Sequence, residues 1–429
     1  MDKSKIIKII ILAIIVCGVL AISIFGLKKH NQQNNNPESP KIYKDNNYNI
    51  RLIKTINDIE NDNYLISPYS IEIALNMLSE GANNNTKKEI DNLIGNRNIE
   101  YFNIKDRISV ANALFIKDIY ASYIKDDFKN ILDKNYSADF IYDEFNKPDK
   151  INNWVNDKTY KMIPSILNDI DKDFVLGMAN AVAIDVDWLN EFECENTNEE
   201  EFTKSNNEKI KVEMMHQKYE HEIEYIDGDD KVVIIPYQTY DNNGDVNKDG
   251  NTLEFVSILP EISVNEYIES LTKEKLDEID KDKKKIGENE ELYLSIPRFS
   301  YEYEIKNFIE LLNNLGINDA FNIRNADFTN IMSKDNMKKY NIDNLYVNTA
   351  IHKTYIDLNE SGTKAAAVTY FGISKATSAL PEEKKEIHIA FNKPFIYMIR
   401  DKKSKEILFF GVVETPNVWK GTTCTNINE

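Results

Sequence analysis

The chain has 429 residues, of which 42% are hydrophobic and 29% are charged, so it is long and apolar enough to bury a large core. Its net charge of -19 argues against nucleic acid or anionic lipid headgroups as partners, because those partners need a basic surface. The three cysteines, Cys17, Cys194 and Cys424, are too few and too scattered for a disulfide framework, so we expect apolar burial to supply the stability.

An unbroken apolar run, Ile9 to Leu27, opens the chain between lysines on both sides. At about 1.5 Å per residue it makes a helix of roughly 28 Å, close to the roughly 30 Å of a bilayer core. The basic residues ahead of the run favour an N terminus inside and a body outside. A cleaved signal peptide is the alternative, because Ala21-Ile22-Ser23 offers a cleavage position. We therefore expect residues 1–29 to be a signal anchor or a signal peptide, and the body to be exported, anchored to the cell membrane or secreted.

The residues after this run divide into a linker, a folded domain and a tail. Residues 30–44 are rich in asparagine, glutamine and proline, which predicts a flexible linker. The folded domain is expected over residues 45–418, with a C-terminal tail over residues 419–429. Within the domain, Ser67-Pro68 predicts the start of a helix, with serine as its cap, and Gly81 predicts its end.

Two polar segments need a decision between function and plain surface. Asp245 to Gly250 matches the start of a calcium loop, but Val256 stands where a bidentate glutamate belongs. Because apolar runs flank this segment, we favour a polar loop between two strands over the calcium alternative, and expect no metal. The charged run from Asp277 to Glu291 is interpreted as a solvated surface connection.

The stretch from Glu360 to Ala376 alternates like a strand but has a poor composition for one. Alanine and glycine are depleted in stable strands, because they offer little side chain for cross-strand packing. This segment is therefore predicted to be able to enter a sheet without being held in one. One face would carry only uncharged side chains, namely Thr363, Ala365, Ala367, Thr369, Phe371 and Ile373.

No sequence motif points to catalysis or to a cofactor. There is no Gly-x-Ser-x-Gly elbow, no His-Glu-x-x-His and no phosphate loop, and the spacing of the five histidines does not fit a metal site. A hydrolase stays only as a weak alternative. One histidine, His352, lies in the run Leu345 to Lys353, whose apolar content predicts a buried central strand.

Four motifs together resemble the serpin family, in the family's order. They are Asn359-Glu-Ser-Gly-Thr-Lys-Ala-Ala-Ala367, Phe391-Asn-Lys-Pro-Phe395, Ser67-Pro-Tyr-Ser-Ile71 and Asn180-Ala-Val-Ala-Ile-Asp-Val-Asp-Trp188. The last departs from the family, because Asp185-Val186 replaces the usual lysine-glycine pair. The resemblance implies an α+β serpin fold with three β-sheets, about eight or nine helices and an exposed reactive-centre loop, in a monomer without a cofactor.

The resemblance also implies three groups of functional residues. The hinge, at the start of the loop, is Glu360, Gly362, Thr363, Ala365, Ala366 and Ala367. The shutter, beneath the gap through which the loop enters, is Ser67, Ser70, Asn180 and His352, with the histidine bonding the asparagine and the serines. The breach, at the top of the gap, is Trp188, Arg298 and Glu360, with an ion pair between the last two.

The function implied by the resemblance is single-use inhibition of a serine protease, which is trapped when the cleaved loop enters the central sheet. Family spacing places the reactive bond between Ala376 and Thr377, with Lys375 and Ala376 as the alternative. The first bond suits a subtilisin-like or elastase-like protease, and the second suits a trypsin-like protease. A non-inhibitory binding protein and an inhibitor of a papain-like cysteine protease are the alternatives.

Overall fold

The computed structural model describes residues 43, 45, 47–95, 102–248, 250, 252–363 and 384–420. The expected anchor or signal segment, most of the linker and residues 364–383 of the loop lie outside these residues. In the part of the chain that the structure describes, no helix is both long enough and apolar enough to span a bilayer.

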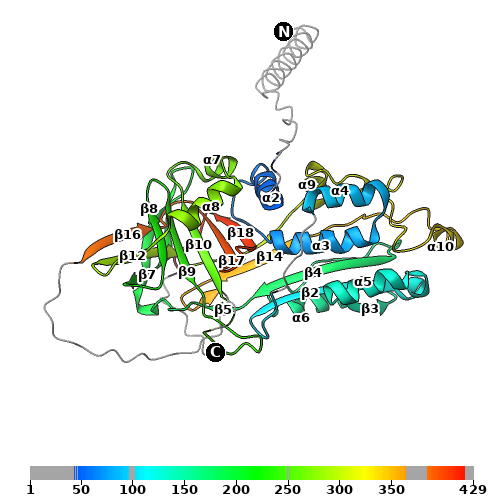
Figure 1. The fold of residues 1–429 in the computed structure, drawn as a ribbon, viewed down its shortest axis with the longest axis horizontal. Coiled ribbons are helices and arrows are strands. Elements are labelled where there is room, and N and C mark those ends of the chain that lie inside the picture. The colour runs from blue at the N-terminus through cyan, green and yellow to red at the C-terminus, as the bar shows by residue number, and fades with distance from the viewer. Residues whose placement is uncertain are drawn as a thin grey trace, which may run out of the picture. The chain divides into compact units, whose positions relative to one another are not determined.

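The chain mixes helices with short and long strands, which confirms the α+β class (Figure 1). The described helices are α2 (Tyr48–Asn57), α3 (Pro68–Gly81), α4 (Asn84–Ile94), α5 (Asp126–Tyr136), α6 (Asp149–Lys158), α7 (Val264–Glu269), α8 (Lys273–Asp282), α9 (Phe308–Asn314) and α10 (Lys334–Lys339). The strands are β1 (Tyr64–Ile66), β2 (Ile108–Lys117), β3 (Asp139–Asp143), β4 (Leu176–Ile184), β5 (Val186–Asp187), β6 (Thr197–Thr203), β7 (Lys209–Tyr219), β8 (Glu224–Asp227), β9 (Lys231–Pro236), β10 (Leu253–Leu259), β11 (Lys284–Lys285), β12 (Glu290–Pro297), β13 (Phe299–Glu304), β14 (Lys353–Leu358), β15 (Gly362–Thr363), β16 (Lys385–Ala390), β17 (Phe395–Asp401) and β18 (Ile407–Val413). Short 3₁₀ turns are η1 (Asp118–Tyr123), η2 (Cys194–Asn196) and η3 (Asp319–Phe321).

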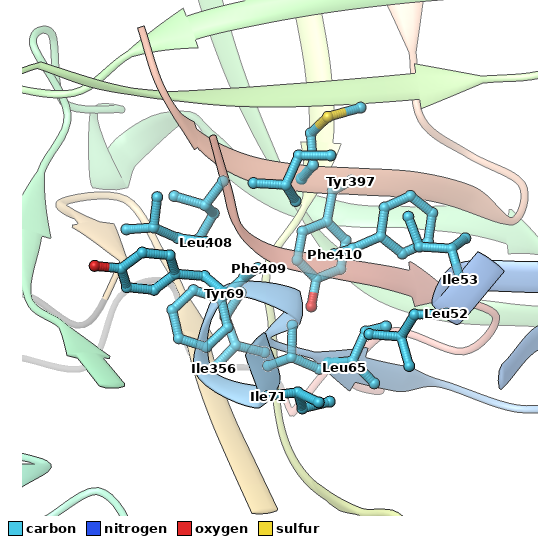
Figure 2. Packing of buried hydrophobic residues seen from close by; sticks show 14 of the residues in the cluster. Leu52, Ile53, Leu65, Tyr69, Ile71, Ile356, Tyr397, Leu408, Phe409 and Phe410 are labelled. Carbon is cyan, nitrogen blue, oxygen red and sulfur yellow. The ribbon is translucent and has the colours of Figure 1, made fainter. Parts of the chain in front are cut away.

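The largest sheet has the order β1-β18-β17-β10-β9-β8-β11, and its buried residues belong to the main hydrophobic core. Its strands β10, β17 and β18 are buried at every position, as their nearly continuous apolar sequences require. Figure 2 shows Tyr397 and Phe410 of this sheet close to Tyr69 of α3 and Ile356 of β14. The core therefore reaches from the large sheet to the strand that precedes the loop.

The remaining described strands form three smaller sheets, ordered β16-β12-β7-β6, β3-β2-β4 and β13-β14-β15-β5. The last two are joined by the chain itself, because β4 continues through Asp185 into β5. Among the described strands, β4 pairs with β2 alone, whereas β14 pairs with β13 and β15. Hydrogen bonding thus divides the described strands into four groups where three sheets were expected, since β4 and β14 are not paired to each other.

Helices α3 and α6 both contact β4, and Figure 1 shows them on opposite sides of it. The α6 side has a small core of its own, in which Trp154 packs edge-on against Phe115 of β2 at a centroid distance of 5.7 Å. On the α3 side, Ser67 caps the helix by accepting from the backbone N–H of Ser70, and α3 ends at Gly81, as predicted.

One sequence interpretation was wrong. The run Leu345 to His352 is irregular, and the strand begins only at Lys353. Its neighbour β13 ends at Glu304 and β4 does not pair with it, so the run has no partner strand among the described residues. The charged run from Asp277 to Glu291 is mostly exposed, as interpreted, although Asp280 accepts two hydrogen bonds, each 2.9 Å, from the buried Arg400. The polar loop after Tyr240 connects two paired strands, β9 and β10, also as interpreted.

Candidate functional site

Two residues of the predicted hinge, Gly362 and Thr363, already lie in a sheet. Strand β15 is only Gly362 and Thr363, and it pairs with β14 on one side and β5 on the other. A Cβ atom on Gly362 would lie 2.2 Å from the carbonyl oxygen of Val186, so only glycine fits between these strands. The start of the loop is thus inserted, and its continuation from Lys364 lies outside the described residues.

The side chain of Thr363 points into the core. It is 3% exposed, and its Oγ1 atom lies 2.6 Å from the hydroxyl oxygen of Tyr237. Because side chains alternate along a strand, this contact identifies the uncharged face of the loop as the face that would turn toward the core.

Next to Thr363, a narrow cavity of about 20 Å³ is lined by residues of both β4 and β14. Its lining is mostly apolar and comes from both strands, from the segment after α6 and from the large sheet. The lining residues are Leu65, Thr159, Met162, Ile163, Val182, Ala183, Ile184, Tyr355, Ile356, Asp357, Thr363, Ile399 and Phe409. The cavity thus lies between β4 and β14, which are not paired to each other, beside the point where the described part of the loop ends.

Trp188 of the predicted breach holds the turn before β15. Its backbone N–H donates to the carbonyl of Ser361 at 2.8 Å, and its indole N–H donates to the carbonyl of Asn359 at 2.9 Å. The ring stacks on Tyr237 with a centroid distance of 4.5 Å. Since Tyr237 also contacts Thr363, one aromatic pair fixes both the turn and the hinge strand.

The carboxylate of Glu360 is 6% exposed and has two described contacts. It accepts a 2.8 Å hydrogen bond from the hydroxyl of Thr197, and its other oxygen lies 3.8 Å from a guanidinium nitrogen of Arg298. The structure thus brings together the breach residues expected from the sequence. The ion pair is long, so Thr197, which the sequence reasoning missed, makes the closer contact.

A second buried carboxylate, Glu213 of β7, shares this site. It is 5% exposed, and burial raises its pKa; Arg298 opposes this shift and the charge of Glu360 adds to it. Sequence reasoning missed Glu213 as well. The signal was a glutamate inside the otherwise apolar run Val212 to Met215.

The predicted shutter residues form a chain of hydrogen bonds rather than a single cluster around the histidine. His352 is buried, its Nε2 atom accepts from the backbone N–H of Ser67 at 3.0 Å, and burial lowers its pKa to about 3. The hydroxyl of Ser67 donates to the carbonyl of Leu408 at 2.6 Å and accepts from the N–H of Ser70 at 3.1 Å. The imidazole is therefore a neutral acceptor, and its hydrogen bond joins the segment before β14 to the start of α3.

The expected bonds from His352 to Asn180 and to the serine side chains are absent among the described contacts. Asn180 instead accepts from the hydroxyl of Ser70 at 2.5 Å and donates to Asn112 at 2.8 Å. The reason is the separation of β4, which carries Asn180, from the segment leading into β14, which carries His352. Asn112, which is 2% exposed, was missed although it is a polar residue at the middle of an apolar strand.

The other predicted site residues lie outside the described residues. They are the hinge alanines Ala365, Ala366 and Ala367 and the reactive-bond residues Lys375, Ala376 and Thr377.

Other chemistry finds little support in the part of the chain that the structure describes. No group of three or more His, Cys, Asp and Glu side chains there could hold a metal. His216 lies 2.9 Å from the hydroxyl of Ser295 and 3.2 Å from the carboxylate of Glu200, which resembles a hydrolase relay. However, Ser295 lies in the middle of a sheet, paired with β7 and β16, where the backbone N–H groups are used in the ladders.

Comparisons with known proteins agree on one family. The family model described as "Serpin (serine protease inhibitor)" matches residues 43–416. The chain is 30% identical over 381 residues to the plasma serine protease inhibitor of Bos taurus, covering 82% of this chain and 85% of that protein. The native-state crystal structure of tengpin, a thermophilic serpin, matches with a TM-score of 0.69 and 32% identity, over 89% of this chain and 96% of tengpin. The complex of thyroxine-binding globulin with thyroxine matches with a TM-score of 0.68 at 22% identity, over 87% of this chain and 98% of that protein, which shows the fold alone.

Proposed function

The chain belongs to the serpin family, and from this premise we propose that it is a single-use inhibitor of a serine endopeptidase. The inhibitor traps the protease as an acyl-enzyme when the cleaved loop inserts into the sheet. The observation that carries this proposal is the position of β15, which is paired between β14 and β5 beside a narrow apolar cavity. Because the first residues of the loop are already paired in the sheet, the rest of the loop can continue the same strand between the same neighbours.

The chemistry begins with the protease. Its serine attacks the carbonyl carbon of Ala376, the peptide bond to Thr377 breaks, and Thr377 leaves as a free amine after gaining a proton. The loop is then attached to the protease by an ester at Ala376 and is free to move at its new end. Inhibition requires that insertion outpaces hydrolysis of this ester.

The register of the hinge predicts where each loop residue goes. Thr363 is opposite Leu358 and Val186, in antiparallel pairs. One step further, Lys364 comes opposite Asp357 and Asp185, so the first of the two lysines before the reactive bond meets two carboxylates. Six residues after Thr363, Thr369 comes opposite His352 and Asn180. The inserted hydroxyl then lies between the two predicted shutter residues that no described hydrogen bond joins in the intact molecule.

Three gains drive insertion. New ladder hydrogen bonds form along β4 and β14, each contributing about 0.5–1.5 kcal/mol. Apolar side chains of the inward face, such as Phe371 and Ile373, become buried, which contributes about 1.5–3 kcal/mol each. The edges of β4 and β14 also cease to be unpaired, which joins two sheets into one.

The class of target follows from the reactive bond. A cut after Ala376 favours a subtilisin-like or elastase-like serine protease, and a cut after Lys375 would favour a trypsin-like one. An exported body, released or held at the cell membrane by residues 1–29, would place the inhibitor where foreign or secreted proteases act. The protein acts as a monomer and needs no cofactor in this proposal.

The second candidate function is a non-inhibitory binding protein. It is favoured by thyroxine-binding globulin, whose structure with thyroxine has a similar fold. An inhibitor of a papain-like cysteine protease is a further alternative, in which the trapped bond is a thioester.

The deciding experiment mixes the protein with subtilisin, elastase, trypsin and papain in turn, followed by electrophoresis under denaturing conditions. A serine protease that forms a covalent complex supports the proposal, and a complex with papain alone supports the cysteine-protease alternative. Cleavage without any complex supports the binding protein. Mass spectrometry of the released peptide then distinguishes Ala376-Thr377 from Lys375-Ala376.

A matched pair of variants tests insertion itself. Ala367→Arg would bring an unpaired cation opposite Thr354 and Val182, inside the core, so we expect cleavage to continue while the covalent complex is lost. Ala379→Arg makes the same change beyond the reactive bond, in the part that does not enter the sheet, so its complex should persist. Equal complex formation by both variants would contradict insertion.

A further inference from the structure

A second pocket, of about 760 Å³, lies beside α10. One wall comes from residues 323–329, after η3, and the other from α10 and the turn that follows it, up to residue 344. Its volume is within the range of pockets that hold small molecules. Figure 1 shows α10 and β16, the strand that follows the loop, at opposite ends of the view. The pocket is therefore separate from the hinge and from the site that a protease would occupy.

The two walls are joined through Asn344. Its side-chain amide donates to the carbonyl of Ile323 at 2.9 Å and to the carbonyl of Ala326 at 2.7 Å. Just beyond it, the N–H of Val347 donates to the carbonyl of Ala320 at 2.8 Å. These bonds fix one wall against the other, so the pocket is a built feature of the fold.

Three cations line the pocket, namely Arg324, Lys334 and Lys338. All three are exposed, and none of their side chains has a hydrogen bond or an ion pair among the described contacts. Lys334 and Lys338 are four residues apart on α10, where like charges repel. Lys334 is also the first residue of the helix, a position where the helix dipole disfavours a cation. The fold gains little from this arrangement, which leaves the cations available to an anionic ligand.

The carboxylates of the pocket do not neutralise these cations. Asp327 accepts from the hydroxyl of Thr329 at 2.6 Å and from the amide of Asn84 at 2.7 Å. Burial raises its pKa, but these bonds and the charge of Lys334 outweigh burial and lower the pKa overall. Asp327 is therefore ionised and already bonded, and Asp343 is the other acidic residue of the lining. Three cations against two carboxylates leave an excess of positive charge here, in a chain whose net charge is -19.

The rest of the lining offers two other kinds of contact. The side chains of Asn341 and Asp343 have no hydrogen bond among the described contacts, and an amide and a carboxylate can both bind hydroxyl groups. Met337, which is 3% exposed, and the half-buried Ile342 add apolar surface. A ligand with an acid group, several hydroxyl groups and a face of C–H groups would use all of these contacts.

We infer that this pocket binds a small organic acid rich in hydroxyl groups, of the chemical class of the acidic sugars. Its carboxylate would bind Arg324, Lys334 and Lys338, with the guanidinium offering two parallel N–H donors. Its hydroxyl groups would bind Asn341 and Asp343. The inference goes beyond inhibition and does not depend on it, because the loop takes no part in the site.

The site is tested by titration calorimetry of the full chain at low ionic strength, with glucuronate as the probe. We expect saturable binding at one site, with glucose and inorganic phosphate both at least about ten-fold weaker. Glucose lacks the charge and phosphate lacks the carbon-bound hydroxyl groups. Equal binding of glucose would overturn the role of the cations, and equal binding of phosphate would overturn the acidic-sugar class. An absence of saturable glucuronate binding would overturn the site itself.

A matched pair of double variants locates the binding. Arg324→Gln with Lys338→Gln should weaken glucuronate binding at least about ten-fold. Lys306→Gln with Lys402→Gln removes the same charge from exposed positions outside the pocket lining and should bind like the wild type. Equal weakening by both double variants would reduce the binding to general charge attraction and overturn the site, as would unchanged binding by the pocket variant.

Amide exchange supplies a readout in the wild type itself. A ligand that bridges the two walls should slow exchange at Val347, whose N–H bonds to the carbonyl of Ala320 across them. The Arg324→Gln, Lys338→Gln variant should show no such slowing at the same glucuronate concentration. Binding that leaves exchange at Val347 unchanged in the wild type would place the ligand elsewhere and overturn the assignment. Neither measurement uses a protease, so a failure to form a covalent complex would overturn the proposed function and not this site.

Discussion

At the scale of single residues, His352 stabilises the fold as a buried acceptor. Its ring satisfies the N–H of Ser67, at the start of α3. His352→Ala leaves that buried donor without a partner, so we expect the free energy of unfolding to fall by about 1–3 kcal/mol. Urea denaturation measures the loss. His388→Ala, at an exposed position, is the control, and an equal effect of both variants would contradict this role.

His352 also predicts how stability depends on pH. Burial lowers its pKa to about 3, from 6.5 in the unfolded chain, so between these values the unfolded state binds a proton that the folded state does not. The stabilising effect of this neutral residue is therefore lost as the pH falls from about 6.5 toward 3. Unfolding of His352→Ala should depend less on pH across this window than unfolding of the wild type. A steeper dependence in the variant would rule this explanation out.

Glu213 predicts a dependence of stability on pH with the opposite sign. Burial raises its pKa, so its charged form destabilises the fold at neutral pH and protonation relieves this effect. Glu213→Gln should raise the melting temperature at pH 7.5, and the difference from wild type should shrink as the pH falls toward 4.5. Calorimetry at both pH values checks this, with Glu199→Gln on exposed β6 as control. The hypothesis fails if Glu213→Gln is less stable at neutral pH.

At the scale of elements, the hinge strand depends on one glycine. A Cβ atom at Gly362 would meet the Val186 carbonyl at 2.2 Å and the Cα atom of Asp187 at 2.8 Å, both of them backbone. Gly362→Ala should therefore displace β15 from between β14 and β5 and expose the indole of Trp188. We expect a red-shifted tryptophan emission and faster amide exchange at Thr363. Gly228→Ala, whose Cβ would have 3.5 Å of room, should change neither measurement.

The sequence predicted those elements whose signals are local. The cap at Ser67, the end of α3 at Gly81 and the polar loop between β9 and β10 depend on short motifs, and all are present. The run Leu345 to His352 was mispredicted, because a strand exists only with a partner, and the absence of pairing with β4 is not visible in its own residues. Apolar content alone indicates burial, not hydrogen bonding.

The candidate site was predictable to a similar extent. The family resemblance implied that Trp188, Arg298 and Glu360 lie together; Trp188 binds the turn that carries Glu360, and Arg298 lies 3.8 Å from the Glu360 carboxylate. Thr197, Glu213 and Tyr237 complete the site but come from other strands, so only tertiary pairing brings them there. Cys194 takes part in a disulfide bond, which the sequence did not indicate because its three cysteines are scattered.

At the scale of the whole molecule, the described strands leave one layer incomplete. The edges of β4 and β14 face a cavity, and β15 fills only the end of the gap between them. A complete sheet would pair both edges and bury the inward face of the loop. The intact molecule is therefore expected to be the less stable of two arrangements of the same chain, held by the connection of the loop to β16.

Cutting the loop between Gly372 and Ser378 should allow the chain to reach the more stable of these two arrangements. The freed strand can then pair along β4 and β14, and several kcal/mol of ladder bonds and apolar burial should raise the melting temperature by at least about 10 °C. Calorimetry before and after limited proteolysis measures the rise. Ala367→Arg, cut at the same bond, is the matched control and should stay near the melting temperature of the intact protein, because an arginine inside the core opposes insertion. If wild type and variant melt alike after cleavage, and neither gains stability, the intact arrangement stores no free energy and inhibition by insertion is not available to this chain.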